Sequence, residues 1–599
     1  MKITYKNQRL EKAVISVNTF NSAVIIATFV MLLGFSEPLI SVSILHAIQI
    51  FCLITMITEK FIRYLNCRSK HEFFRGYWHE IPLLILLVLS VIFIRKFSHA
   101  ADPVLLMNRA VAVYLIIQVV DKLCRTSVSL AASATSPTLT LILSFLVLIV
   151  GGAGFLYLPN SHNCEKLSAV DALFTSTSAV CVTGLIVKDT GVDFSAMGQW
   201  VILILIQLGG LGIVIFGAVF SLLLGQAFTL KESVAMQDIL NTGTVNKIGR
   251  MIAFIFVATI IIESVGVILL LDNWNFDTRT DINGHGALFY SLFHSVSAFC
   301  NAGFALYSDS FTGFKNNWQT YLVICPLIVT GGLGFGVLYN ITEVLSNRWK
   351  LIKHRLFKGK TIIGSIQLRH LNLHSKVVLF SSLFLILLGT AGFMILERYN
   401  PQQTGLNYNG QNGQLFLDSF FQSVTTRTAG FNTIDNGAIS QPSKMLTIIL
   451  MCIGGSPGST AGGMKTVTFM VVILAAAAVI SRKNEPEIFH RSIQKDFISR
   501  AVMVLVLYIA ILFIVTFGLA VTESGSGLDF NNLAFEAASA LGTVGLSTGL
   551  TASLSTGGKL LLIAAMIIGR LGPMTLVASL AFKIKKSNYN YPSEPITIG

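Results

Sequence analysis

Charged residues are scarce in this chain. Only 12% of its 599 residues are Asp, Glu, Lys or Arg, whereas 53% are hydrophobic, and the mean hydropathy is +0.71. A soluble protein of this composition would have more apolar side chains than its cores could bury, so a soluble globular fold is excluded. The composition indicates an all-α polytopic membrane protein surrounded by membrane lipid.

Paired cysteines and clustered histidines are lacking as well. The eight cysteines include no CxxC pair, and only Cys164 is expected outside, so neither a disulfide framework nor a metal site is supported. The histidines, among them His294 and His370, stand in no motif with a nucleophile or a metal ligand, so no enzyme is expected. The net charge of +14 lies in short segments between apolar runs, where membrane orientation explains it without nucleic acid.

The sequence predicts twelve apolar spans, judged against the roughly 20 residues that a helix needs to cross a bilayer. Four of them lie near residues 16–35, 38–57, 80–95 and 103–121. The other eight form four pairs: 137–158 with 199–224, 250–271 with 318–340, 376–396 with 444–480, and 500–521 with 558–582. The basic segments are 60–75, 348–360, 482–495 and 583–586; they place both termini in the cytoplasm.

One short pattern recurs four times between the paired spans. A glycine follows a phenylalanine by ten residues in FTSTSAVCVTGL, FHSVSAFCNAGF, FFQSVTTRTAGF and FEAASALGTVGL, beginning at Phe174, Phe293, Phe420 and Phe535. The nearly constant spacing makes each copy one structural module. Because the apolar pieces before the glycines are too short to cross, we expect re-entrant loops. Glycine permits left-handed backbone there, and a ring of carbonyl oxygens can replace the water around a cation.

The motifs resemble those of the Trk/Ktr/HKT superfamily of potassium uptake proteins. Their residues are most similar to those of the bacterial Ktr membrane subunit. The matching stretches are TSTSAVCVTGLIVKDT (175–190), HSVSAFCNAGF (294–304), QSVTTRTAGFNTID (422–435) and SALGTVGLSTGLT (539–551). This resemblance covers about residues 137–582. It implies four membrane-pore-membrane repeats around a central pore, at 137–225, 249–340, 375–480 and 498–586. Residues 1–125 then form a four-helix extension, for which a packing or assembly role is favoured over voltage sensing because its helices carry few arginines.

The resemblance also implies which carbonyl groups form the ion filter. They would come from Val182, Thr183, Gly184, Asn301, Ala302, Gly303, Thr428, Ala429, Gly430, Thr543, Val544 and Gly545. In this superfamily a serine at the first filter glycine accompanies sodium preference. Because that position is Gly184 here, potassium is the expected ion, with sodium as a possible activator.

A glycine-rich stretch, GGSPGSTAGG at 454–463, interrupts the predicted span 444–480. From the residues alone, a cavity-lining loop and a simple helix kink fit equally well. The resemblance implies a flexible loop below the filter that obstructs permeation. Its gate residues would be Gly454, Gly455, Ser456, Gly458, Gly462 and Gly463, with Lys465 and Arg570. For Arg570 the structural alternative is an ion pair with Glu263.

Two other charged residues lie close to the filter. Arg427 directly precedes the third set of filter residues, and we expect it to point away from the axis toward Asp418, Asp435 or Glu536. Asp171, at the start of the first pore helix, is either a helix cap or part of a vestibule that attracts cations.

The expected function is potassium uptake across the cytoplasmic membrane, driven by the membrane potential and gated by the loop and Arg570. The resemblance further implies a homodimer on a cytosolic ring of nucleotide-binding regulatory subunits. The alternative is a coupled secondary cation transporter with alternating access. That alternative calls for inverted repeats and acidic residues at mid-membrane, of which Glu263 is the main candidate.

Overall fold

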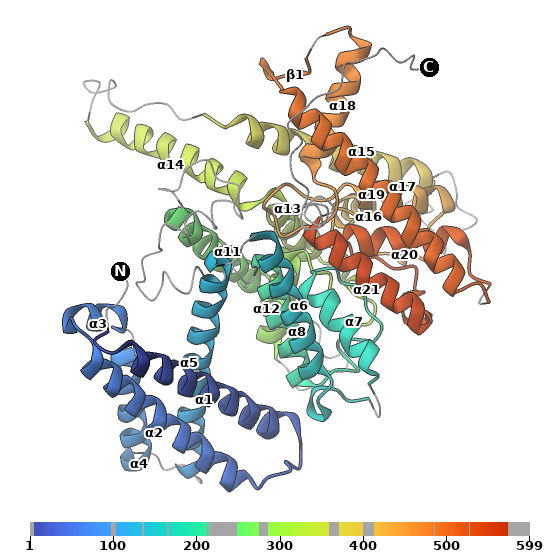
Figure 1. Cartoon of the computed structure of the whole chain (residues 1–599). Helices are drawn as coiled ribbons and strands as arrows, with labels where there is room; N and C mark the ends of the chain where they lie inside the picture. Colours follow the sequence, from blue (N-terminus) through green and yellow to red (C-terminus); the bar gives the residue numbers. More distant parts are fainter. Residues whose placement is uncertain are drawn as a thin grey trace, which may run out of the picture.

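The computed structural model describes residues 5–78, 80–97, 103–133, 137–164, 167–212, 215, 218, 248–274, 286–358, 370–398, 412–483, 485–525 and 527–572. Figure 1 shows a smaller N-terminal group of helices beside a larger group that contains the other helices. Within the described residues, the regular elements are helices apart from the hairpin of β1 (Glu487–Ile488) and β2 (Arg491–Ser492). The protein is a helical membrane protein.

The N-terminal module consists of five helices. They are α1 (Gln8–Gly34), α2 (Val42–Asn66), the short α3 (Lys70–Gly76), α4 (Glu80–Phe97) and α5 (Pro103–Ser133). The four predicted spans fall on the four long helices. The predicted loop 60–75 is mostly helical instead, because α2 continues to Asn66 and α3 follows almost at once.

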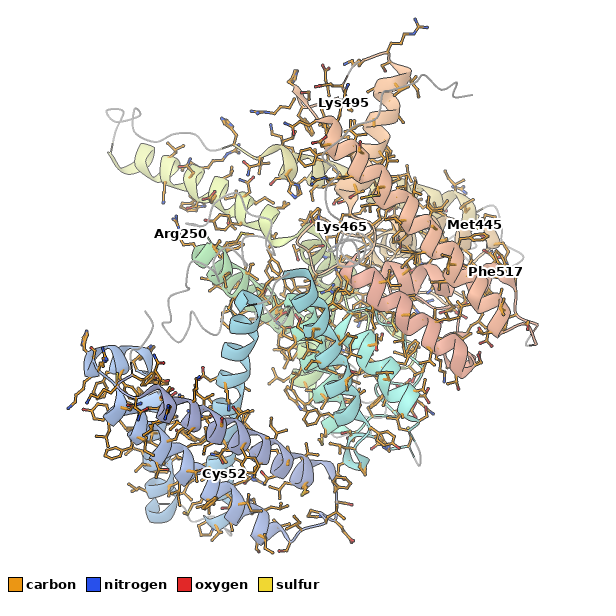
Figure 2. All side chains as sticks on the ribbon, in the orientation of Figure 1. Cys52, Arg250, Met445, Lys465, Lys495 and Phe517 are labelled. Carbon is orange, nitrogen blue, oxygen red and sulfur yellow. The ribbon has the colours of Figure 1, made fainter. Side chains whose placement is uncertain are left out.

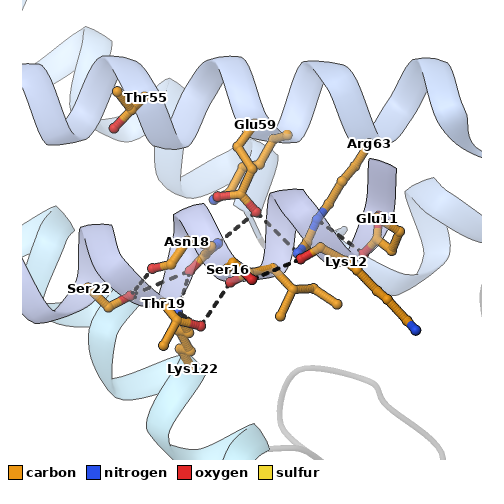
Figure 3. Close-up of polar contacts among 12 residues, drawn as sticks. Glu11, Lys12, Ser16, Asn18, Thr19, Ser22, Thr55, Glu59, Arg63 and Lys122 are labelled. Atoms are coloured by element: carbon orange, nitrogen blue, oxygen red, sulfur yellow. Dashed lines mark hydrogen bonds and ion pairs between the residues drawn. The ribbon is translucent and has the colours of Figure 1, made fainter. Parts of the chain in front are cut away.

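A network of charged and amide side chains joins α1, α2 and α5 (Figure 3). The buried Glu59 accepts a hydrogen bond from Asn18 at 2.7 Å and pairs with Arg63 at 3.2 Å. Arg63 also pairs with Glu11 at 3.4 Å, and Lys122 donates to Asn18 Oδ1 at 2.7 Å. Partners of this kind offset the cost of desolvating each charge. The charges are therefore concentrated in one cross-link between helices rather than spaced along a single helix.

The larger group, the pore module, repeats one order of elements four times. The first repeat has α6 (Pro137–Leu156), α7 (Ala169–Val180) and α8 (Ala196–Leu211); the second has α11 (Ile248–Leu270), α12 (Ala287–Cys300), α13 (Cys325–Leu333) and α14 (Phe335–Lys358). The third has α15 (Leu373–Arg398), α16 (Asn412–Thr425), α17 (Gln441–Cys452) and α18 (Thr466–Ile480); the fourth has α19 (Lys495–Thr522), α20 (Phe530–Gly542) and α21 (Thr556–Leu571). In each repeat the short second helix is the pore helix.

The repeats interleave into a closed ring. Each pore helix packs against the second span of the neighbouring repeat: α12 against α8, α16 against α13, α20 against α17, and α7 against α21. An ion pair of 2.8 Å between Lys559 on α21 and Asp171 on α7 crosses the seam between the fourth and first repeats. The four modules therefore share one axis.

In the first three repeats, a glycine and a serine set how closely the first span approaches its pore helix. Ser176, Ser295 and Ser423 donate to carbonyl groups of the first spans at 2.7 to 2.8 Å, namely those of Ile149, Glu263 and Ile386. A Cβ on Gly266 would collide with Ser295 and approach Leu327 Cδ1 to 2.9 Å. Gly152 and Gly389 face a serine and a leucine in the same way. In these three repeats the first span can thus lie directly on its pore helix.

The third repeat departs from the predicted register by one residue. Phe174, Phe293 and Phe535 are fully buried on their pore helices, and in the third repeat Phe421 is the fully buried phenylalanine. The expected residue Phe420 is only partly buried. Ser423 likewise lies one residue nearer to its glycine than Ser176 and Ser295 do. The third pore helix therefore reaches its glycine with one residue fewer.

The structure describes only part of the predicted spans 199–224 and 558–582, because most of 213–224 and all of 573–582 lie outside the described residues. Five described helices are long and apolar enough to cross a membrane, or six if one bent pair counts as a span, whereas the sequence predicts twelve. Three helices of the second spans end at a glycine: α8 before Gly212, α21 before Gly572 and α13 before Gly334, each with φ between +82° and +85°. The predicted span 318–340 bends by 101° between Leu333 and Phe335.

Candidate functional site

The four repeat glycines meet at one point of the pore module. A Cβ added to Gly184 would lie 3.0 Å from the Cα of Gly303, and one added to Gly303 would lie 2.9 Å from the Cα of Gly430. A Cβ added to Gly430 would lie 3.1 Å from the Cα of Gly545, and one added to Gly545 would lie 3.0 Å from the Cα of Gly184. The order closes on itself, and any larger residue would collide with its neighbour's backbone.

The backbone takes the same unusual path in every copy. The residue two places before each glycine has a positive φ: 58° at Val182, 60° at Asn301, 76° at Thr428 and 49° at Thr543. The glycines themselves have φ values of 90°, 69°, 82° and 93°. Non-glycine residues rarely adopt this left-handed region, and strain of this kind is typical of functional sites. We call the three residues that end at each glycine a filter segment.

Hydroxyl groups of the pore helices hold the filter segments from behind. Ser178 Oγ accepts from the Gly184 amide at 3.0 Å, and Ser539 Oγ accepts from the Gly545 amide at 3.1 Å. Ser297 donates to the Phe304 carbonyl at 2.8 Å. The carbonyl groups of Thr183 and Gly184 in the first filter segment accept no hydrogen bond within the described residues. Buried carbonyl groups without a donor are the ligands that a desolvated cation needs.

The glycine-rich stretch is a loop rather than a kinked helix, because α17 ends at Cys452 and α18 begins at Thr466. We call residues 454–463 the gate loop. Its ends are tied by the amide of Gly454, which donates to the Met464 carbonyl at 2.8 Å, and by Thr466, which donates to the Gly455 carbonyl at 3.1 Å.

The gate loop lies against two filter segments. Thr460 Oγ1 donates to the Phe299 carbonyl at 3.3 Å and accepts from Asn301 Nδ2 at 3.5 Å. A Cβ on Gly462 would approach the Cβ of Thr543 to 3.0 Å. The loop therefore lies against the second and fourth filter segments in this structure.

Backbone hydrogen bonds also join the gate loop to the bend between α13 and α14. The Ser456 amide donates to the Gly332 carbonyl at 3.0 Å, and the Phe335 amide donates to the Gly458 carbonyl at 3.1 Å. Ser456 Oγ donates to the carbonyl of Leu333. These contacts surround Gly334 and hold the loop against the bend.

Two partly buried cations, Arg570 and Lys465, hold consecutive carbonyl groups of the gate loop. Arg570 donates to the Thr460 carbonyl and, on α8, to the Gly209 carbonyl at 2.5 Å and the Gly210 carbonyl at 3.3 Å. Lys465 donates to the Ala461 carbonyl at 2.7 Å. Figure 2 places Lys465 near the middle of the molecule, far from Lys495 at its upper edge. Arg570 does not pair with Glu263, which accepts from Gln207 at 3.4 Å.

The residue motif around Arg570 is a repeat that the sequence reasoning missed. GGLG occurs at 209–212 and at 331–334, GRLG at 569–572, and GGSP at 454–457. In the three helical copies, the first glycine of the motif packs against the backbone of a pore helix. The residue contacted lies four places before that pore helix's filter glycine, and it is Val180, Phe299 or Leu541. Arg570 therefore occupies the place that glycine takes in the other repeats. Aligning the second spans, as well as the filter segments, would have found it.

Arg427 has a different partner from the one expected. It donates to the carbonyl and the hydroxyl of Ser382 on α15, at 3.3 and 3.2 Å, and no acid pairs with it within the described residues. The predicted partner Asp418 accepts from Tyr321 instead, and Glu536 accepts from three hydroxyl groups, of Ser547, Thr548 and Thr551.

Asp171 is not the helix cap, because Ser168 caps α7 by accepting from the Asp171 amide at 3.0 Å. Its carboxylate is engaged by Lys559, so its role at this end of the pore module is a cross-link between repeats.

The chain matches the family model TrkH, described as "Cation transport protein", over residues 106–591. The chain belongs to this cation transport family. Ktr system potassium uptake protein B of Bacillus subtilis is 38% identical over 469 residues, which are 78% of this chain and 97% of that protein. The protein of the same name from Vibrio alginolyticus is 36% identical over 77% of this chain and 94% of its own length. Potassium/sodium uptake protein NtpJ of Enterococcus hirae is 35% identical over 78% of this chain and 97% of its own length.

The fold has a solved counterpart in the potassium transporter TrkH from Vibrio parahaemolyticus. The two structures share a TM-score of 0.54 at 18% identity, covering 85% of this chain and 98% of that one. The TrkH family match begins at residue 106, near the start of α5. Helices α1, α2 and α4, and most of the network in Figure 3, precede the family match.

Proposed function

We propose that this TrkH family protein takes up potassium across the cytoplasmic membrane through the four filter segments. The observation that carries this proposal is the closed order of Gly184, Gly303, Gly430 and Gly545. In the first segment the carbonyl groups of Thr183 and Gly184 accept no hydrogen bond within the described residues. Relatives at 35–38% identity are named potassium or potassium/sodium uptake proteins. Potassium fits a ring of backbone carbonyls because such a ring replaces its hydration shell.

The ion choice is proposed to rest on glycine in all four repeats. A serine at position 184 would add a Cβ that collides with the Ala302 carbonyl and would push the second filter segment away. A distorted ring holds fewer carbonyls at the distance that potassium needs. Sodium as an activator of uptake remains part of the proposal, since one relative is named for both ions.

The gate loop is proposed to obstruct the pathway until Arg570 and Lys465 release it. Both cations hold its second half through the carbonyls of Thr460 and Ala461. Their charge in a site of low dielectric also repels a permeating cation. Opening would require the carbonyls to move away from Arg570, which then keeps its contacts to Gly209 and Gly210.

Regulation is proposed to come from a homodimer on a cytosolic ring of nucleotide-binding subunits. The surface that supports this is α14, which extends away from the pore module in Figure 1 and follows the 101° bend. It exposes Leu345, Trp349 and Ile352 next to the basic Arg348 and Lys350. A partner bound to α14 would pull on the bonds that join Gly334 and its neighbours to the gate loop.

Coupled transport with alternating access has less support. All four repeats have the same order of elements, and Glu263 lies on the side of α11 that meets Gln207, not at the filter segments.

Potassium uptake by a transport-deficient bacterial strain tests the proposal. We expect expression of the chain to restore growth at low external potassium, with a regulatory subunit supplied if needed. Gly286→Ala is the matched control for Gly303→Ala, because a Cβ at Gly286 would meet nothing within 4 Å. Loss of uptake in both variants alike, or no uptake by the parent, would contradict the filter assignment.

A further inference from the structure

Arg427 is the one charged residue directly before a filter segment. At the same place before the glycine, the first, second and fourth repeats have Cys181, Cys300 and Gly542. These are small residues, and all lie in buried positions. A guanidinium group at this place of the third repeat therefore breaks the fourfold equivalence of the ring, and it does so immediately next to Thr428.

The third repeat also has a shorter connection from pore helix to filter. Its fully buried phenylalanine is Phe421, and the serine that bonds the first span is Ser423, each one residue nearer to the glycine than in the first two repeats. The backbone bond differs as well: the Ala429 amide donates to the Thr425 carbonyl, four residues back, whereas the Thr183 amide donates to Ser178, five residues back. A tighter connection needs another means of setting the position of Thr428.

The Arg427 side chain supplies a contact that spans from filter to first span. Its two terminal nitrogens donate to one residue, Ser382 of α15, through the carbonyl and the hydroxyl groups. A two-point contact fixes the direction of the guanidinium plane, which a single bond would leave free to rotate. The same small cavity is lined by Arg427, by Gly332 before the bend and by Gly455 of the gate loop. The third filter segment is therefore connected to α15 and faces the gate.

We propose that Arg427 is a positioning residue that sets the geometry of the third filter segment and thereby the preference for potassium over sodium. Its role is to hold the backbone of Thr428 in position, without contacting the ion. In the first two repeats, the longer connection from pore helix to glycine sets this position instead. This inference rests on the proposed function, since it assigns a role within the same filter.

The test compares ion preference in Arg427→Gln, Arg427→Lys and Ser382→Ala, measured as the apparent KM and Vmax for potassium and as sodium uptake by the same cells. We expect Arg427→Gln to lower the preference for potassium over sodium by about tenfold, as the loss of a charged hydrogen-bond pair would. Arg427→Lys keeps the charge and one contact, so its preference should fall between those of the parent and Arg427→Gln. Ser382→Ala removes only the hydroxyl acceptor and should lower the preference by about threefold.

A double variant and a neighbouring serine separate positioning from general packing. If Arg427 acts through Ser382, the Arg427→Gln/Ser382→Ala variant should be no less selective than Arg427→Gln alone. Ser381→Ala is the control, because Ser381 donates to the Val378 carbonyl within its own helix. A merely structural role would lower Vmax with the amount of protein in the membrane and leave ion preference unchanged.

The outcomes distinguish this inference from the proposed function. A parent that takes up potassium, with variants whose ion preference equals that of the parent, would overturn the role of Arg427 alone. If Arg427→Gln fails to accumulate, an unchanged preference in Ser382→Ala overturns it equally. A parent without potassium uptake would instead refute the proposed function.

Discussion

Replacing Arg570 with alanine should raise basal potassium flux, because it removes the side chain that ties the gate loop to α8. In the structure this residue donates to Thr460 on the loop and to Gly209 and Gly210 on the neighbouring span. Only the bond to Thr460 is lost when the loop opens. Hydrogen bonds from a charged group contribute about 1.5–3 kcal/mol each. The equilibrium constant that favours the closed loop over the open loop should therefore fall by roughly 10- to 150-fold.

Flux through purified protein in potassium-loaded liposomes measures this change without a regulatory subunit. Arg570→Lys should give an intermediate flux, because lysine keeps the charge but cannot reach both sides at once. Arg250→Ala, a change at an exposed arginine at the start of α11, controls for loss of positive charge. Equal flux from Arg570→Ala and the parent, at equal amounts of folded protein, would refute the tether; lower flux would indicate that Arg570 holds the pathway open.

Three further predictions follow from the same geometry. Gly184→Ser should admit sodium, because the added Cβ would collide with the Ala302 carbonyl. The change would be measured as a sodium-dependent loss of potassium accumulation, and unchanged selectivity would contradict the steric role of Gly184. Gly334→Ala should raise basal flux, because its φ of +85° and a Cβ 2.9 Å from the Pro457 carbonyl would displace the gate loop, whereas Gly336→Ala, with nothing within 4 Å, should behave as the parent. Lys559→Gln should lower stability by about 1–3 kcal/mol, measured as a reduced melting temperature in detergent; an unchanged melting temperature would mean that the pair with Asp171 does not stabilise the seam.

The repeated glycines and the order of spans could be predicted from sequence, because each glycine recurs within the same apolar pattern. The register of the third repeat could not. Two adjacent phenylalanines, Phe420 and Phe421, both suit the pattern, and only burial distinguishes them. The partner of Arg427 could not be predicted either. Its positive charge suggested an acidic partner, whereas the acceptor in the structure is the neutral Ser382.

The bend inside the predicted span 318–340 was missed for a different reason. The residues on both sides of Gly334 are apolar, so a prediction from hydropathy gives one continuous span. In the structure the chain bends by 101° at this glycine, which has a positive φ. The loop at 454–463 was predictable as a break because glycine and proline dominate it, but its bonds to the α13–α14 bend depend on tertiary contact.

The interleaved ring has a consequence for how the protein is made. The first pore helix packs on α21, and the ion pair between Asp171 and Lys559 joins residues 388 positions apart. At 5–20 residues per second, a ribosome needs roughly 20–80 s to synthesise that stretch. During this interval α7 has been inserted but its final neighbour does not yet exist. The earliest repeat to leave the ribosome is thus among the last to be completed, and a chain that stops before the fourth repeat leaves a polar, half-assembled surface for membrane quality-control proteases to recognise.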